Sequence, residues 1–195
     1  YVPTSLMVYD LLREIGLKAE NSLWISTIGT ISDYGHKTNP DFMKLSKQRY
    51  PDLLKGGQPI KTKLGSSAKT IYSAIICKGE FGAKYVLNTL VKAKDFEDFI
   101  SNKNLAGWRK TVDDEIDNVV KDFNKNKEVI GDIVFYEIKS VLNVTSILSN
   151  IIAEKNPEKI IVIGKASNEG GWKVSTRAPR AGGKSVDLSK IVPAA

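Results

Sequence analysis

Cysteine and histidine are almost absent from this 195-residue chain, which has one of each, Cys77 and His36. A single thiol excludes an internal disulfide framework and a cluster of thiolates around zinc or an iron–sulfur centre. A single imidazole excludes multi-histidine metal sites and leaves at most one histidine for a hydrolytic triad. We therefore expect a protein of the reducing cytoplasm, with neither a bound metal ion nor a cofactor.

Long apolar runs are missing as well. No stretch approaches the roughly 18 uninterrupted apolar residues of a membrane helix, and the first residues lack the basic-then-apolar pattern of a secretory signal. With 42% hydrophobic and 26% charged residues, the composition is that of an ordinary folded, soluble protein. We expect no membrane partner.

Basic residues are in excess, with 29 Lys and Arg against 22 Asp and Glu and a formal net charge of +7. Such an excess favours polyanionic partners, because Lys and Arg neutralise phosphates and release the counterions around them. Charge alone fits a solvated basic surface equally well. The distribution of the charge therefore matters more than its total.

Helical periodicity runs through residues 4–124, beginning with Val8, Leu11, Leu12 and Ile15 at spacings of three and four. Residues 23–31 are apolar on most faces, which is typical of a central packed helix. Further helices are expected after Pro40, from residue 66 or 67, and around residues 85–90, with serine or asparagine caps. The clearest pattern covers residues 108–123, where an apolar stripe and a charged face predict a long connecting helix.

The period changes after residue 127. Residues 133–138 and 159–163 are typical of strands, and a regular apolar face between them predicts a helix capped by Asn143 and ended by Pro157. Residues 172–176 alternate like a strand that pairs with the preceding one through a glycine-containing turn, and residues 187–191 resemble a short helix. We predict an α/β (α+β-like) chain, with a mostly helical part at 1–126 and a small α/β domain at 127–195.

Few residues offer catalytic chemistry. Asp33 and His36 could face one metal ion, but two ligands are too few to hold it, so a local role for both is favoured. The acidic run at residues 113–115 lies mostly off the apolar stripe and fits a solvated helix face better than an acid–base pair. The segment 164–171 lies between two strands, whereas a phosphate-binding P-loop lies between a strand and a helix. We expect no catalytic residues.

The segment 175–185 is the best candidate for a binding surface. It combines three cations with small hydroxyl residues and glycines, all of which can approach phosphate oxygens closely. We predict nucleic-acid-binding roles for Ser175, Arg177, Arg180 and Lys184. Two alternatives remain open: a solvated basic loop without a ligand, and a loop that meets an acidic protein surface.

Two landmarks resemble the RecJ-like DHH family. Ile-Ile-Val-Ile-Gly at 160–164, Trp-Lys-Val-Ser-Thr-Arg at 172–177 and Val-Asp-Leu-Ser-Lys-Ile at 186–191 are similar to the DHH-associated nucleic-acid-binding domain. Gly-Thr-Ile-Ser-Asp at 29–33 resembles the segment that ends the family's catalytic DHH domain. The resemblance covers most of the chain and implies that the helical part is the remnant of a DHH domain.

The resemblance assigns Asp33 the position of a metal ligand, but the family's Asp-x-Asp, Asp-His-His and Gly-Gly-His motifs are missing. One aspartate cannot assemble a two-metal phosphoesterase, so Asp33 is expected to be vestigial. The resemblance then implies a degenerate archaeal replisome member, the counterpart of the inactive RecJ-derived subunit of the replicative CMG helicase. Its expected partners are the GINS complex, the MCM helicase and single-stranded DNA.

The competing hypothesis is a metal-dependent single-strand exonuclease or oligonucleotide phosphoesterase of the same family. The printed chain begins at Tyr1. If a longer native chain supplies the missing motifs, the same sequence belongs to a nuclease.

Overall fold

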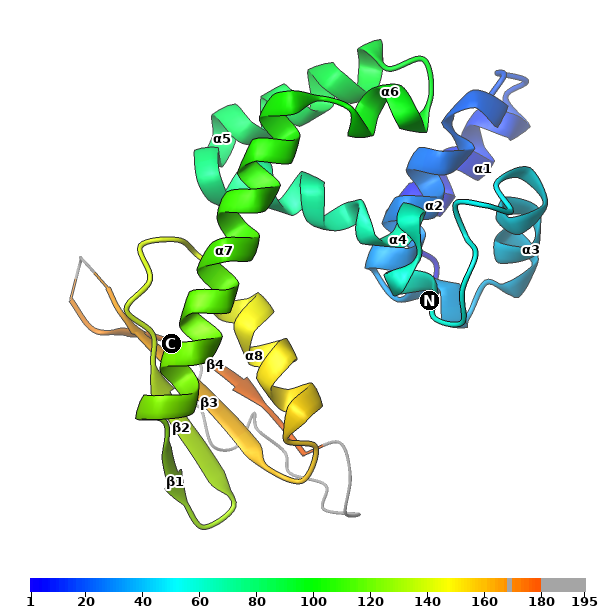
Figure 1. The fold of residues 1–195 in the computed structure, drawn as a ribbon. Helices are drawn as coiled ribbons and strands as arrows, with labels where there is room; N and C mark the ends of the chain where they lie inside the picture. The colour runs from blue at the N-terminus through cyan, green and yellow to red at the C-terminus, as the bar shows by residue number, and fades with distance from the viewer. Residues whose placement is uncertain (168–169, 180–195) are drawn as a thin grey trace. The chain divides into compact units, whose positions relative to one another are not determined.

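The computed structural model describes residues 1–167 and 170–179 (Figure 1). The chain divides into two compact units, Tyr1–Arg109 and Lys110–Ala195, which we call unit 1 and unit 2. Unit 1 is built from helices, and unit 2 combines helices with a four-stranded sheet. The predicted mixture of helix and sheet, with the helical part first, is confirmed. No helix among the described residues is long and apolar enough to cross a membrane.

Unit 1 surrounds the apolar helix α2. Its helices are α1 (Thr4–Glu14), α2 (Leu23–Ser32), α3 (Pro40–Arg49), α4 (Lys63–Ser66), α5 (Ala68–Lys92), α6 (Phe96–Ile100) and the first turns of α7 (Lys103–Asn126). Trp24 of α2 packs against Phe96 and Phe99 of α6, with ring centroids 5.9 and 5.6 Å apart. The central packed helix expected at residues 23–31 is therefore present, buried on most of its faces.

The periodicity of α1 predicts its helix correctly but not its buried side. Leu6 and Tyr9 are buried, whereas Val8, Leu11 and Ile15 are exposed. A helix turns once every 3.6 residues, so these two sets lie on different faces. The regular spacing of Val8, Leu11 and Ile15 is visible in the sequence, but it does not mark the face that is buried.

The predicted serine and asparagine caps are wrong at the level of the side chain. Ser22 and Ser67 stand at the N-cap positions of α2 and α5, but their hydroxyl groups donate to the carbonyl groups of Ala19 and Leu64 instead. In unit 2, Val144 rather than Asn143 precedes the first residue of its helix. A capping hydroxyl group accepts from a backbone N–H, whereas the hydroxyl groups of Ser22 and Ser67 each donate to a carbonyl group three residues earlier, which is a local alternative to capping.

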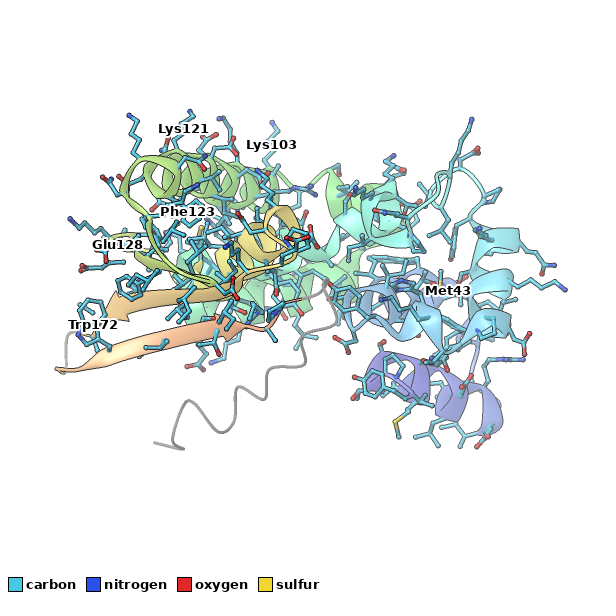
Figure 2. All side chains as sticks on the ribbon, turned by 90° about the horizontal axis from the view of Figure 1, so that it is seen from below. Met43, Lys103, Lys121, Phe123, Glu128 and Trp172 are labelled. Carbon is cyan, nitrogen blue, oxygen red and sulfur yellow. The ribbon has the colours of Figure 1, made fainter. Side chains whose placement is uncertain are left out.

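The charged-and-apolar helix predicted at residues 108–123 is confirmed as α7. Val112, Ile116, Val119 and Phe123 are buried, and Figure 2 shows Phe123 directed toward the sheet and Lys121 directed away from it. The predicted domain boundary at residues 126 and 127 lies at the end of this helix, whereas the compact units divide within it. The later turns of α7 belong to unit 2 because their apolar stripe packs there.

Unit 2 has the sheet order β1-β2-β3-β4. The strands are β1 (Glu128–Ile130), β2 (Ile133–Glu137), β3 (Ile160–Ala166) and β4 (Trp172–Arg177), and α8 (Thr145–Lys155) connects the parallel pair β2 and β3. The predicted hairpin between β3 and β4 is confirmed, with Gly170 and Gly171 at positive φ in its turn. Sequence patterns missed β1, because three exposed residues carry no alternation of polar and apolar side chains.

Candidate nucleic-acid interface

Ser175 and Arg177 lie on the face of β4 that α8 covers. They pair with Ile163 and Ile161 of β3, and both of these isoleucines are fully buried. Because successive side chains of a strand alternate between its faces, Ser175 and Arg177 share this side. Contacts between α8 and β4 place both residues beside the first turns of α8.

The guanidinium group of Arg177 bridges β4 and α8. Its Nε donates to Oδ1 of Asn150 at 2.7 Å, and its Nη1 donates to Oγ of Ser175 at 3.2 Å and to the carbonyl oxygen of Thr176 at 2.8 Å. Its Nη2 contacts the hydroxyl and carbonyl oxygens of Ser146 at 3.2 and 3.5 Å on the exposed side. Nε and Nη1 therefore anchor the side chain, and Nη2 is the weakly held edge that faces solvent.

A chain of hydroxyl groups supports this arrangement. Ser149 donates to the carbonyl oxygen of Ser146 at 2.9 Å, and its Oγ lies 3.0 Å from Oγ of Ser175. Since each hydroxyl group has one proton, Ser175 must donate to Ser149, which leaves the lone pairs of Ser175 to accept from Arg177. Ser149 is fully buried, so the position of Ser175 is set by the packing of α8.

Among the described residues, only neutral groups form hydrogen bonds with Arg177. Its partners are an amide, hydroxyl groups and carbonyl groups, and no Asp or Glu in the described part of unit 2 forms an ion pair with it. No described carboxylate therefore neutralises the positive charge of Arg177. A phosphate oxygen at Nη2 would gain a charge-assisted hydrogen bond, which is stronger than the neutral contacts to Ser146.

Two lysines that the sequence reasoning did not single out extend this positive surface. Lys165 of β3 and Lys173 of β4 face each other across the strands, on the same side of the sheet as Arg177. Nζ of Lys165 donates to the carbonyl oxygen of Leu142, just before α8. Two cations directly opposite each other destabilise a strand pair, and a bound phosphate would relieve that repulsion. The alternation of residues 173, 175 and 177 was the signal that could have identified Lys173.

Arg180 and Lys184, the other two predicted contacts, lie outside the described residues, and so does the short helix predicted at residues 187–191. The described part of the interface therefore consists of Ser175 and Arg177, together with Lys165 and Lys173. Arg177 is the only residue of the predicted set whose charge the structure describes.

Asp33 lies at the end of α2, as the position after its last residue, and is exposed. His36 follows in a short 3-10 turn, 6.2 Å from the ring of Tyr34. Within residues 1–167 and 170–179, no three His, Cys, Asp or Glu side chains lie together in a way that could hold a metal ion. The described residues around Asp33 thus offer no set of three ligands for one.

Asp114 of the acidic run on α7 and the glycine-rich segment have structural roles. Asp114 pairs with Lys110 one turn earlier at 2.7 Å, and both side chains are exposed. Residues 164–171 include the end of β3 and the turn into the antiparallel β4, so the segment is a hairpin connection, as predicted.

A scan of protein-family models found no match to the chain, and a search of curated proteins also found none. The RecJ-like relationship therefore remains a prediction from the motifs.

Proposed function

We propose that this protein is a non-catalytic DNA replication factor that binds single-stranded DNA along the β4–α8 surface and associates with the GINS complex and the MCM helicase. The partners and the DHH relationship follow from the RecJ-like motifs. The β4–α8 surface, defined by Lys165, Lys173, Ser175 and Arg177, supports the DNA-binding part.

One observation carries the proposal: within residues 1–167 and 170–179, the groups that hold the guanidinium group of Arg177 in place are all neutral. Structural arginines that are half buried usually meet a carboxylate, because an unpaired charge away from water is unfavourable. Here the side chain is oriented but its charge is not neutralised. A surface of this kind suits a phosphate, whose oxygens can accept from Nη2 and from the two lysines.

The test is a salt titration of binding to a fluorescent oligothymidine of about 20 nucleotides. Arg177→Gln removes the charge but keeps an amide that can contact Asn150. We expect it to weaken binding at least about tenfold, the effect of losing a hydrogen bond to a charged group. The slope of log K against log salt should fall in magnitude by about 0.7, the value for one phosphate contact on a single strand.

Lys155→Ala is the matched control, because it removes one positive charge from the exposed end of the same helix. Its affinity should stay within about twofold of the parent protein, since the effect of the total charge alone is small at physiological salt. Equal losses of affinity in the two variants would mean that the protein binds DNA through a nonspecific basic surface. Unchanged binding by Arg177→Gln would reject the site.

The absence of catalysis has its own test. Incubation of the protein with single-stranded DNA and manganese should leave the DNA intact. Turnover that Asp33→Ala abolishes would replace this proposal with the metal-dependent nuclease. Association with purified GINS in the presence of a nuclease would separate a direct protein contact from one bridged by DNA.

A further inference from the structure

Helix α1 has two apolar faces, and the described residues of unit 1 cover only one of them. Leu6 and Tyr9 are each 4% exposed, and Tyr9 packs edge to face against Phe42 of α3, whereas Val8, Leu11 and Ile15 are 49%, 56% and 62% exposed. The exposed three recur at spacings of three and four residues, so they form one stripe along the helix. These side chains are neighbours on the helix surface, unlike apolar residues that are scattered singly over a protein surface.

The apolar surface continues from the stripe onto α2. A shallow groove of about 240 Å³ lies between the two helices, with Val8, Leu12 and Ile25 among its lining residues. Leu12 and Ile25 are half buried. The surface therefore offers a hollow beside a ridge, which is the shape that receives the side chains of a packed helix.

One flank of the stripe is acidic. Asp10 and Glu14 are exposed, one turn apart, and neither forms an ion pair within the described part of the chain. Arg13, the basic residue of α1, instead lies over the ring of Tyr9, with its Cζ 5.8 Å from the ring centroid. Two like charges one turn apart destabilise a helix slightly, and cations opposite them would reverse that effect.

A second copy of the chain does not supply those cations through α1. In an antiparallel pair of α1 helices, each flank meets the same flank of the partner, so Asp10 and Glu14 would face their own counterparts. In a parallel pair, they would face the apolar groove. Like charges opposed across an interface select against a partner.

We infer that the outer face of α1 is a docking site for an amphipathic helix of a partner protein, with an apolar stripe for Val8, Leu11 and Ile15 and a basic flank for Asp10 and Glu14. This mode is the helix-in-groove type of recognition. The inference deepens the proposed docking role and rests on it. It concerns unit 1, whereas DNA binding concerns unit 2, so either can fail without the other.

The probes are two synthetic 21-residue helices with identical leucine positions, one with lysine and one with glutamate at the polar positions. Binding to the full chain is measured by isothermal titration calorimetry. We expect the lysine helix to bind, and Leu11→Asp or Ile15→Asp to weaken it at least tenfold. Leu87→Asp is the matched control, because Leu87 on α5 is 60% exposed, and it should leave binding unchanged. Circular dichroism verifies that each variant is folded.

Charge reversal identifies the flank. The double variant Asp10→Lys with Glu14→Lys should bind the glutamate helix in preference to the lysine helix. Absence of binding by both helices, or a preference that does not reverse, would overturn the inference. A dimer of the parent protein in sedimentation velocity that Leu11→Asp dissociates would assign the face to a second copy and overturn it too. Oligothymidine binding by Leu11→Asp should remain at the parent level, and Arg177→Gln should keep its affinity for the lysine helix.

Discussion

Tyr136 connects the sheet of unit 2 to α7 through both its ring and its hydroxyl group. The ring meets Phe123 edge to face with centroids 5.4 Å apart, and the hydroxyl group donates to Oδ2 of Asp122 at 2.6 Å. Burial raises the pKa of Tyr136, and the hydrogen bond and charge of Asp122 raise it further. The protonated phenol is therefore part of the folded state.

A tyrosine whose pKa is raised on folding stabilises the protein below the pKa of the unfolded chain, about 10. That stabilisation is lost as the pH rises further, because the unfolded chain releases the proton first. We expect the melting temperature to fall between pH 9 and pH 11, and to fall less in Tyr136→Phe. At pH 7 the same substitution should cost about 1.5–3 kcal/mol, the effect of a hydrogen bond to a charged group. Thermal melts of both proteins across this pH range test the expectation.

Burial also raises the pKa values of Tyr9 and Tyr50 in unit 1. Both the parent protein and Tyr136→Phe should therefore lose some stability at alkaline pH. The difference between the two proteins isolates Tyr136. An identical decline of the melting temperature in both proteins would show that Tyr136 does not contribute to the loss of stability at alkaline pH.

At the residue scale, the sequence itself shows the candidate residues Ser175 and Arg177, as a hydroxyl and a cation two positions apart on a strand, and their binding role stays a prediction. The sequence does not show their supporting partners. Ser146, Ser149 and Asn150 come from α8, at separations of 26–31 residues from the side chains they contact. Only the packing of that helix on the sheet brings them together.

At the scale of the element, α5 shows how one glycine permits a turn and another permits close packing. Gly79 has φ 56° and ψ −133°, which breaks the helix where the sequence predicts two segments. Just after the break, Gly82 lies against the carbonyl group of Ala74. A Cβ at position 82 would stand 2.0 Å from that oxygen.

Gly82→Ala should therefore destabilise unit 1, because a backbone atom and not a mobile side chain blocks the added methyl group. We expect a loss of about 1–3 kcal/mol, the usual effect of overpacking. Gly107→Ala on α7 is the matched control, since no atom lies within 4 Å of its added Cβ. The control should stabilise the protein by about 0.5–1 kcal/mol, because alanine favours a helix over glycine. Urea unfolding of both variants provides the comparison, and a stabilising Gly82→Ala would contradict the close approach.

For the whole molecule, each of the two compact units has fully buried apolar side chains. The core of unit 1 contains Trp24, Phe99 and Leu105 and extends no further along the described chain than Trp108. In unit 2, Leu148, Ile161 and Ile163 are fully buried between α8 and the sheet. Each unit thus has apolar side chains enough for a core of its own.

A substitution in the core of one unit should lower the hydrogen-exchange protection of backbone amides in that unit and not in the other. We expect Leu148→Ala to cost about 2–5 kcal/mol and to reduce hydrogen-exchange protection in α8 and β3 while α2 keeps its protection. Phe99→Ala should show the opposite pattern, because local stability follows the cooperative unit to which a residue belongs. Hydrogen exchange of both variants, measured by mass spectrometry, tests this expectation. Equal loss of protection across both units in each variant would mean that the chain unfolds as one body.

The sequence by itself determined the helices of the first part, the order of helix and strands after residue 127, and the face of α7 that is buried. Each of these depends on contacts between near neighbours along the chain, which periodicity records. Tertiary structure alone decided which stripe of α1 is covered, where the units divide, and which groups of α8 hold Arg177. These outcomes depend on residues far apart in the sequence, and their contacts form only when the elements pack.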